Sequence, residues 1–165
     1  MSPSNNHAAL AMTCIVSLCM AQMALAQNTQ HDYLHTHNTA RAEVGVGALT
    51  WDDTLEAYAH NYAKIRSGDC QLIHSHGPYG ENIYYGYGKG YQDGADAVRF
   101  WLDEKDIYDH DGNACVDGQD CLHYTQIVWR GTRRVGCARA QCDNGDFFVT
   151  CNYSPPGNVV GERPY

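Results

Sequence analysis

Residues 134–153, RVGCARAQCDNGDFFVTCNY, contain two runs of strand length on either side of Asp143-Asn144-Gly145. That tripeptide is a strong hairpin signal, so antiparallel strands are predicted at residues 134–142 and 146–153. Counting outward from a three-residue turn places Cys137 opposite Cys151. Directly opposed strand residues have β-carbons within disulfide reach, so this register suggests a Cys137–Cys151 bridge.

Two helices are predicted upstream of the hairpin. The first lies near residues 30–44, because Gly45 follows four residues that recur at helical spacing: Leu34, His37, Arg41 and Val44. The second begins at Asp52 or Asp53, either of which can cap it, and Gly68 ends it. Glu56 follows Asp53 at the capping-box spacing, and the apolar stripe consists of Leu55, Tyr58, Tyr62 and Ile65.

The middle of the chain is less regular. A strand is predicted at residues 81–85, and a third helix at residues 93–106 with Ala97, Trp101 and Glu104 on one face. Residues 123–129 form a short apolar run that fits either a strand or two helical turns. Helices and strands therefore alternate around one core, which predicts an α+β or α/β sandwich.

The first 26 residues contain no Asp, Glu, Lys or Arg, and they end on Ala24-Leu25-Ala26. An apolar stretch that closes on an A-x-A pattern is typical of a secretory signal peptide. A retained membrane anchor is the alternative, although the stretch is barely long enough to span a bilayer. We therefore expect a signal peptide at residues 1–26 and one exported domain at residues 27–165.

Cysteine usage agrees with export. Two of the eight cysteines, Cys14 and Cys19, leave with the signal, and the remaining six are Cys70, Cys115, Cys121, Cys137, Cys142 and Cys151. An even number in an exported chain implies three disulfides, but six cysteines allow fifteen pairings. A zinc finger is the weaker alternative, because no C-x-x-C pair occurs.

The net charge of −8 argues against a nucleic-acid partner held by bulk charge. Acidic residues concentrate between Asp93 and Asp120, whereas arginines gather between Arg130 and Arg139. Both stretches fit a solvated surface, and the acidic one also fits a cation-attracting rim.

The sequence contains no G-x-S-x-G elbow, no H-E-x-x-H and no glycine-rich phosphate loop. Histidines and glutamates are therefore the remaining candidates for chemistry. Glu81 and Glu104 stand out among them. Glu81 lies beside the apolar run Ile83-Tyr84-Tyr85, and Glu104 shares a helical face with Trp101, so we expect both carboxylates to be drawn toward the interior.

Six blocks of the chain resemble plant pathogenesis-related proteins of class one, which belong to the CAP superfamily together with venom allergens and cysteine-rich secretory proteins. They stand in the same order as in that family: Cys70-Gln71-Leu72-Ile73-His74-Ser75, Gly80-Glu81-Asn82-Ile83, Trp101-Leu102-Asp103-Glu104, His123-Tyr124-Thr125-Gln126-Ile127-Val128-Trp129-Arg130, Val135-Gly136-Cys137-Ala138 and Cys151-Asn152-Tyr153-Ser154-Pro155-Pro156-Gly157-Asn158. The resemblance implies an α+β fold, a three-layer α-β-α sandwich. It also implies three disulfides, Cys70–Cys142, Cys115–Cys121 and Cys137–Cys151.

The resemblance further implies a cleft lined by two histidines and two glutamates, which match His74, Glu81, Glu104 and His123. Two imidazoles and two carboxylates suit a divalent cation such as zinc, although no cofactor is required. Four protein ligands would fill the tetrahedral shell of zinc, so we expect no catalysis. A metal-dependent hydrolase that uses this cleft is the alternative function.

The family is associated with sterol and lipid binding and with release of a C-terminal signalling peptide. Tyr84, Tyr85, Tyr87 and Tyr91 fit a mobile aromatic loop for a lipid, and an ordinary surface loop fits equally well. Release between Ser154 and Pro155 would free residues 155–165, which a receptor would recognise. The expected protein is thus a secreted, monomeric plant defence protein of the apoplast. It is antimicrobial through sterol or lipid binding, and it is not an integral membrane protein.

Overall fold

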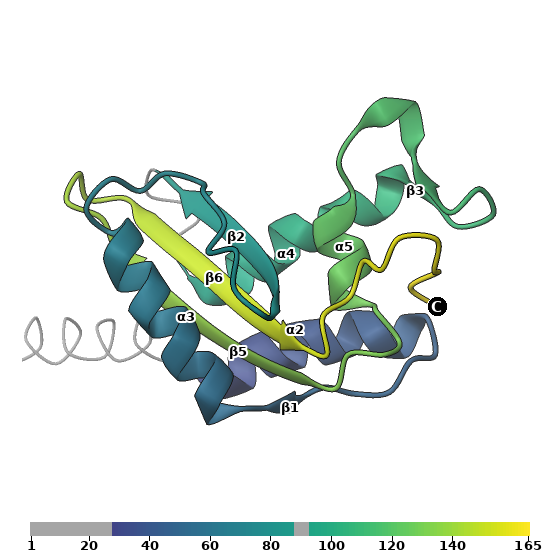
Figure 1. The fold of residues 1–165 in the computed structure, drawn as a ribbon, viewed down its shortest axis with the longest axis horizontal. Coiled ribbons are helices and arrows are strands. Elements are labelled where there is room, and N and C mark those ends of the chain that lie inside the picture. The colour runs from purple at the N-terminus through teal and green to yellow at the C-terminus, as the bar shows by residue number, and fades with distance from the viewer. Residues whose placement is uncertain (1–27, 88–92) are drawn as a thin grey trace, which may run out of the picture.

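The computed structural model describes residues 28–87 and 93–165 (Figure 1). The predicted signal peptide and Tyr91 lie outside these residues. The helices are α2 (Gln30–Glu43), α3 (Asp53–Arg66), α4 (Gly94–Asp103) and α5 (Leu122–Ile127), with 3₁₀ turns η1 (Glu104–Ile107) and η2 (Val116–Gly118). The strands are β1 (Thr50–Trp51), β2 (Gly80–Gly86), β3 (Tyr108–Asp109), β4 (Ala114–Cys115), β5 (Arg134–Gln141) and β6 (Phe147–Ser154).

The main sheet has the strand order β1-β5-β6-β2. Strands β5 and β6 form the predicted antiparallel hairpin, and Cys137 lies directly opposite Cys151, which confirms the predicted register. Strand β2 pairs with the other edge of β6, where Glu81 is opposite Asn152. Strand β1 is parallel to β5 and pairs only with Arg134 and Val135. The two-residue strands were not predicted from the sequence.

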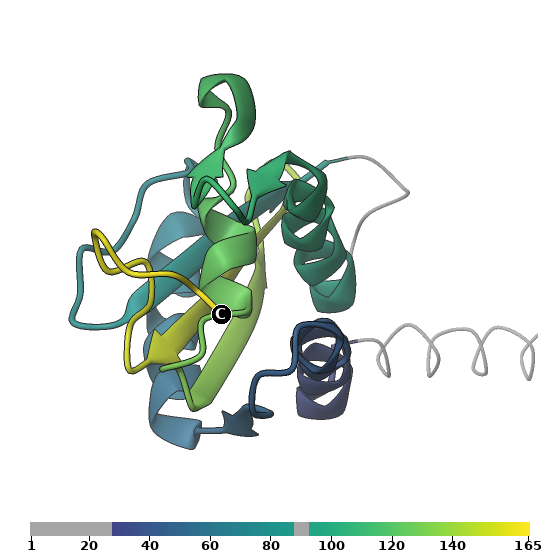
Figure 2. The same ribbon diagram turned by 90° about the vertical axis from the view of Figure 1, so that its right-hand side faces the viewer.

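Helices cover both faces of this sheet, as Figures 1 and 2 show: α3 lies on one face, and α2, α4 and α5 lie on the other. Each face has its own apolar cluster. The cluster under α3 includes Ala59, Ile83 and Phe148, and the larger one includes Trp101, Ile127 and Tyr153. This arrangement confirms the three-layer α-β-α sandwich.

Helix α3 begins after Asp52, one of its two predicted caps, and differs from its prediction in the capping box and in the apolar stripe. Its cap is Asp52, whose carboxylate accepts from the backbone N–H groups of Thr54 and Leu55. Glu56 therefore closes no capping box and instead accepts from Trp51 Nε1 at 2.9 Å. The predicted apolar stripe is also wrong at Ile65, which is 70% exposed because it lies on the solvent side of the helix.

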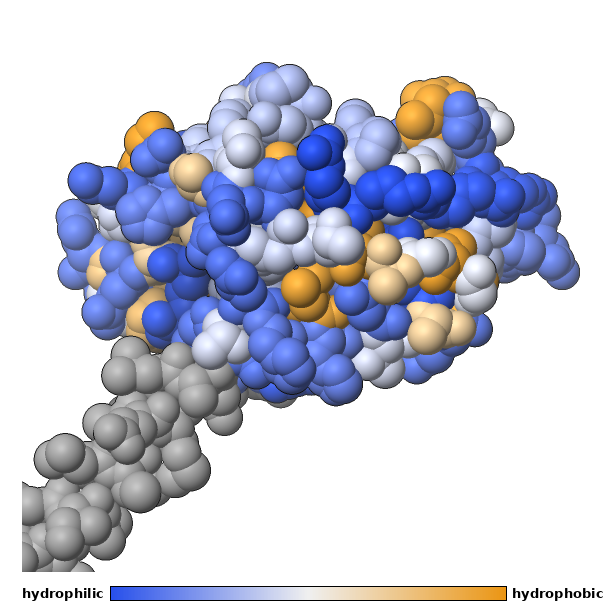
Figure 3. Space-filling model, turned by 90° about the horizontal axis from the view of Figure 1, so that it is seen from below, coloured by the Kyte–Doolittle hydropathy of each residue, from blue (hydrophilic) through white to orange (hydrophobic). Residues whose placement is uncertain are grey.

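Three disulfides staple the fold, and they join Cys70 to Cys142, Cys115 to Cys121 and Cys137 to Cys151. The Cys137–Cys151 bridge lies inside the core, whereas Cys115–Cys121 ties the β3–β4 lobe to the start of α5. Within the described residues no helix is long and apolar enough to cross a bilayer. The face seen from below is mostly hydrophilic, with hydrophobic residues in small separate groups (Figure 3).

Candidate functional site: two histidine–glutamate pairs

His123 and Glu104 form a hydrogen-bonded pair between α5 and the turn η1. Glu104 Oε1 accepts from His123 Nδ1 at 2.6 Å, and the Trp101 ring stacks on the imidazole at 5.9 Å between centroids. The other carboxylate oxygen accepts from the backbone N–H groups of His123 and Tyr124 at 3.0 and 3.1 Å. Glu104 therefore holds both the side chain and the backbone of the residue that it faces.

This contact supplies the cap that α5 lacks. The residue before the helix, Cys121, makes no side-chain capping bond, so the first N–H groups of α5 need an acceptor from elsewhere. A carboxylate at a helix N-terminus satisfies them and complements the helix dipole. Glu104 is thus the cap of α5, supplied by a distant part of the chain.

His74 and Glu81 repeat the arrangement on strand β2. Glu81 Oε1 accepts from His74 Nδ1 and from the Ser75 backbone N–H, each at 2.8 Å, and Oε2 accepts from Asn152 Nδ2 at 3.3 Å. The Glu81 side chain is 6% exposed, whereas the His74 side chain is 48% exposed. Glu81 therefore anchors an exposed loop to the sheet through one histidine and one backbone N–H.

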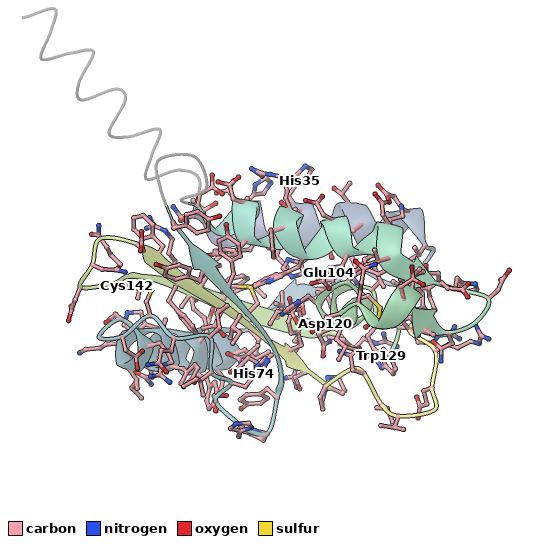
Figure 4. All side chains as sticks on the ribbon, turned by 90° about the horizontal axis from the view of Figure 1, so that it is seen from above. His35, His74, Glu104, Asp120, Trp129 and Cys142 are labelled. Carbon is pink, nitrogen blue, oxygen red and sulfur yellow. A yellow bond between two sulfur atoms is a disulfide. The ribbon has the colours of Figure 1, made fainter. Side chains whose placement is uncertain are left out.

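The two pairs lie on opposite sides of β2. Consecutive strand residues point to opposite faces, and Glu81 and Asn82 are consecutive. Asn82 Nδ2 donates to the backbone carbonyl of His123 at 3.1 Å, which places His123 on the face away from Glu81. Figure 4 shows the same separation, with Glu104 toward α4 and α5 and His74 toward the loop beside α3.

This geometry bears on the proposed metal. In each pair the histidine Nδ1 is hydrogen-bonded to the glutamate. Nε2 is therefore the nitrogen that could bind a metal ion. Among residues 28–87 and 93–165, no three His, Cys, Asp or Glu side chains are grouped so as to hold a metal ion. As arranged, His74, Glu81, Glu104 and His123 therefore do not fit a four-ligand zinc centre, because both carboxylates already serve protein donors.

A buried polar chain joins the His123 pair to the core. The fully buried His37 accepts at Nε2 from the Tyr153 hydroxyl at 2.9 Å, and that hydroxyl accepts from Asn82 Nδ2 at 3.2 Å. His37 Nδ1 is bonded to the Tyr33 carbonyl at 2.8 Å. Burial lowers the pKa of His37 to about 4, because the charged imidazolium would lose its hydration.

Arg41 is the second buried polar residue of α2, and its guanidinium is bonded only to backbone carbonyls in the described part of the chain. It donates to Ile127, Trp129 and Thr132 from its terminal nitrogens and to Gly47 from Nε, at 2.7 to 3.0 Å. Burial lowers the pKa of Arg41 to about 10. Arg41 thus fixes the segment that follows α5.

Helical spacing predicted that His37 and Arg41 lie in one helix, but it did not predict their hydrogen bonds. Most of their partners are carbonyls and a hydroxyl that are distant in sequence, and no local sequence pattern indicates such contacts. The roles of Asn82 and Asn152 were not predicted for the same reason, although Asn82 follows Glu81 and Asn152 follows Cys151 in the sequence.

The predicted aromatic loop is wrong in part. Tyr84 and Tyr85 lie in strand β2. Tyr84 is 8% exposed and packs on Phe100, and the Tyr85 hydroxyl donates to Asp146 on the facing hairpin. The two tyrosines are held this way because the strand continues to Gly86. Tyr87 is the predicted loop residue that the structure describes as exposed, at 73%.

The C-terminal segment is bound along α5. Gly157 N–H donates to Gln126 Oε1 at 2.8 Å, and Asn158 accepts from Thr125 Oγ1 at 2.7 Å and donates to the Leu122 carbonyl. The last residue, Tyr165, stacks its ring on His110 at 4.9 Å. At the predicted junction, Ser154 is half-buried and Pro155 is exposed.

Comparisons with known proteins agree with this architecture. Residues 34–153 match the cysteine-rich secretory protein family (CAP). The chain is 56% identical over 156 residues to pathogenesis-related protein 1A of Nicotiana tabacum, covering 94% of this chain and 92% of the relative. It is 49% identical over 162 residues to the pathogenesis-related protein PR-1 type of Sambucus nigra, covering 97% and 96%. These relatives are named as pathogenesis-related proteins and not as enzymes.

Solved structures show the same fold at lower identity. Venom allergen-like protein 4 of Schistosoma mansoni has a TM-score of 0.66 at 25% identity, covering 82% of this chain and 92% of that chain. NaASP2, solved with Zn²⁺, has a TM-score of 0.68 at 24% identity, covering 84% and 87%. The chain therefore belongs to the cysteine-rich secretory protein (CAP) family and is a homologue of the plant pathogenesis-related 1 proteins.

Proposed function

We propose that this protein is an exported plant defence protein of the apoplast that acts as a monomer and captures sterols or other lipids of microbial membranes. The defence role is supported by the 56% identity to the tobacco protein over nearly its whole length. Export is supported by the uncharged leader that ends on Ala24-Leu25-Ala26 and by the three disulfides.

The observation that supports lipid capture is the exposure of two aromatic side chains near the end of β2, Tyr87 stacked on Tyr85 and Phe100 of α4 packed on Tyr84. Tyr87 is 73% exposed at the end of β2, and Phe100 is 54% exposed on α4, where it packs on Tyr84 at 5.2 Å between centroids. Exposed aromatic rings gain free energy on burial against a lipid, and they are stiff enough to lose little entropy on doing so. Tyr84 supports Phe100 and Tyr85 supports Tyr87, and neither supporting tyrosine is proposed as a lipid contact.

Sterol transfer from phosphatidylcholine vesicles that contain ergosterol tests this proposal. Replacing Tyr87 and Phe100 together by serine should lower the amount of sterol extracted at least fivefold. The matched control is Ile65→Ser, which removes an equally exposed apolar side chain on the opposite layer of the sandwich. Equal extraction by the wild type and the Tyr87/Phe100 variant would refute lipid capture at this surface.

We also propose that residues 155–165 are the precursor of a signalling peptide that a receptor recognises. Exposed Pro155 gives a protease access to one side of the Ser154–Pro155 bond, whereas Tyr153 on the other side is buried in β6. Release therefore requires the end of β6 and the tail along α5 to open. Asn158→Ala, which removes two tail contacts, should increase release, measured by mass spectrometry of extracellular fluid after immune challenge.

Asn144→Ala is the control for that experiment, because Asn144 is an exposed asparagine of the hairpin turn, far along β6 from the junction. Persistent absence of the peptide while intact protein is present would count against release.

A metal-dependent hydrolase is the rival function, and it is favoured by the Nε2 atoms of His74 and His123, which have no hydrogen-bond partner among the described residues. Hydrolytic activity that is lost with a chelator and restored by zinc would establish that rival.

A further inference from the structure

Helix α2 carries two histidines on its exposed side, away from the two histidine–glutamate pairs. His31 and His35 are four residues apart, so their side chains leave adjacent turns of one helix face. Both residues are exposed, and Figure 4 shows His35 on the outer side of the molecule, pointing away from the sheet. Neither residue belongs to the lipid surface or to the C-terminal segment, so this pair is independent of the proposed function.

The two imidazoles lie beside each other and nearly parallel. Their ring centroids are 5.8 Å apart, and their planes differ by 4°. Metal–imidazole bonds are about 2.0–2.1 Å long, so two nitrogens on one ion lie within about 4.2 Å of each other. Because the nitrogens lie on the ring edges and both side chains are exposed, small rotations bring one nitrogen of each ring to a shared ion. The same spacing places two zinc ligands on one helix face in the H-E-x-x-H motif.

The ring nitrogens of this pair are available to an ion. His37 uses both of its ring nitrogens inside the protein, and His74 and His123 each use Nδ1 on a glutamate. The imidazoles of His31 and His35 make no hydrogen bond to another residue in the ranges that the structure describes, 28–87 and 93–165. An ion therefore binds here without displacing a protein partner.

The helix holds the two backbone positions fixed. Thr29 and Asp32 form a capping box at its start, and Tyr33 and His37 bury its other side, at 3% and 0% exposure. When two ligands are attached to one rigid element, the second metal bond forms at a high effective concentration of the second ligand. The pair therefore binds an ion as a chelate, much more tightly than a single surface histidine does.

The charge around the pair favours a cation. A hydrogen bond from Thr29 lowers the pKa of the Asp32 carboxyl, and both imidazoles of the pair lower it further. Asp32 Oδ1 lies 4.0 Å from His31 Nδ1, so a carboxylate stands beside the ring and offsets the positive end of the helix dipole. Arg99, which lines the groove beside His35, is balanced by an ion pair within α4.

We propose that His31 and His35 form a surface site for Cu²⁺, bound through one nitrogen of each imidazole. Imidazole suits copper, nickel and zinc, and in the general order of affinities Cu²⁺ binds such ligands most tightly. Structural zinc sites use four protein ligands, whereas no third His, Cys, Asp or Glu joins this pair in the described part of the chain. The remaining positions around the ion are left to water, so the site exchanges its ion and does not staple the fold.

Calorimetric titration of the protein with Cu²⁺ supplied as its glycine complex tests the proposal, because glycine competes out binding to single side chains. Cu²⁺ should bind saturably, and electron paramagnetic resonance should show two coordinated imidazole nitrogens. Zn²⁺ supplied in the same way should bind at least about tenfold more weakly. No saturable binding of Cu²⁺, or Zn²⁺ binding as tight as that of Cu²⁺, would overturn the proposal.

Single variants locate the ion. His31→Ala and His35→Ala should each weaken Cu²⁺ binding at least about tenfold, because either change leaves a single imidazole. His60→Ala is the matched control, since it removes an exposed histidine of α3. The terminal amine also binds Cu²⁺, but it is the same in all three variants and cannot cause a difference between them. Equal binding by His31→Ala and His60→Ala would overturn the proposal.

A spacing variant separates chelation from the number of histidines. His35→Ala/Thr39→His keeps two exposed histidines on α2 but sets them eight residues apart, which is about 12 Å along the helix. This variant should bind Cu²⁺ as weakly as His35→Ala does, whereas His74→Ala/His123→Ala should bind it like the wild type. Wild-type binding by the spacing variant, or a loss of binding in His74→Ala/His123→Ala, would overturn the proposal.

Discussion

Glu104, paired with His123, is hydrogen-bonded to the start of the buried helix α5. Glu81, paired with His74, is hydrogen-bonded to an exposed loop. Each carboxylate accepts three hydrogen bonds, and in both cases one comes from an imidazole Nδ1 and at least one from a backbone N–H. What differs is the segment held: α5 contributes Tyr124 and Ile127 to the core, but the loop around His74 is mostly solvent-exposed.

The two histidine–glutamate pairs therefore stabilise the fold to different extents. Loss of Glu104 leaves two helix N–H groups without an acceptor beside the core. Loss of Glu81 leaves the Ser75 N–H of an exposed loop and the side-chain amide of Asn152 without this acceptor. The histidines differ in the same direction, since the His123 side chain is 23% exposed and that of His74 is 48% exposed.

The largest effect should follow from replacing the glutamates. We expect Glu104→Ala to lower the free energy of unfolding by about 4 kcal/mol and Glu81→Ala by about 2 kcal/mol, because charged hydrogen bonds are strong and buried unpaired N–H groups are costly. Urea denaturation of both variants measures the difference. Equal losses would break the comparison.

Acid should act on the side of β2 that carries His123. The folded pKa of His37 is about 4 against an ordinary value of 6.5, so between these pH values the unfolded chain binds the proton and the folded chain does not. Stability contributed by neutral His37 is therefore present above about pH 6.5 and is lost as pH falls toward 4, by about 3 kcal/mol in total.

Denaturant unfolding at pH 7.0, 6.0, 5.0 and 4.5 checks this slope. His37→Gln, which has no titrating group but keeps polar atoms near Tyr153, should be less stable at neutral pH and should lose most of the slope. His35→Gln is the matched control, since His35 is an exposed histidine of the same helix. A slope unchanged in His37→Gln would show that other groups cause it.

The histidines should give a smaller contrast. His123→Ala removes a hydrogen bond to Glu104 and the contact with Trp101, so we expect a loss of about 2 kcal/mol. His74→Ala removes an exposed imidazole and should cost about 0.5 kcal/mol. Thermal unfolding of the two variants measures the contrast, and a larger loss in His74→Ala would reverse the ranking of the two pairs.

Metal removal should have the smallest effect. Because both glutamates already serve protein donors, dialysis against a chelator should leave the melting temperature within about 1 °C of the untreated protein. Zinc titration by calorimetry provides the second readout. A saturable heat that disappears in a His74→Ala/His123→Ala variant would show that the two Nε2 atoms share a metal after all.

Sequence reasoning predicted the elements whose cause is local. The hairpin register follows from one three-residue turn, and α2 and α4 follow from helical spacing. Helix α5 could not be assigned, because its cap is Glu104, which lies 18 residues before the helix begins. The two-residue strands have too little pattern to detect. Tyr84 lies in the strand predicted at residues 81–85, and the aromatic loop that the family resemblance suggested is wrong for this residue.

The site was predicted as a set but not as an arrangement. The family resemblance identified His74, Glu81, Glu104 and His123, yet their division between the two sides of β2 depends on strand pairing and on Asn82. The side of the sheet on which each group lies is what the structure adds.

Amide hydrogen exchange tests the central claim most directly, because the claim concerns particular backbone N–H groups. Glu104→Gln should lower the protection of the His123 and Tyr124 amides while that of Ser75 stays unchanged, and Glu81→Gln should lower Ser75 alone. Unchanged protection of His123 and Tyr124 in Glu104→Gln, or equal loss at all three amides in both variants, would contradict the account.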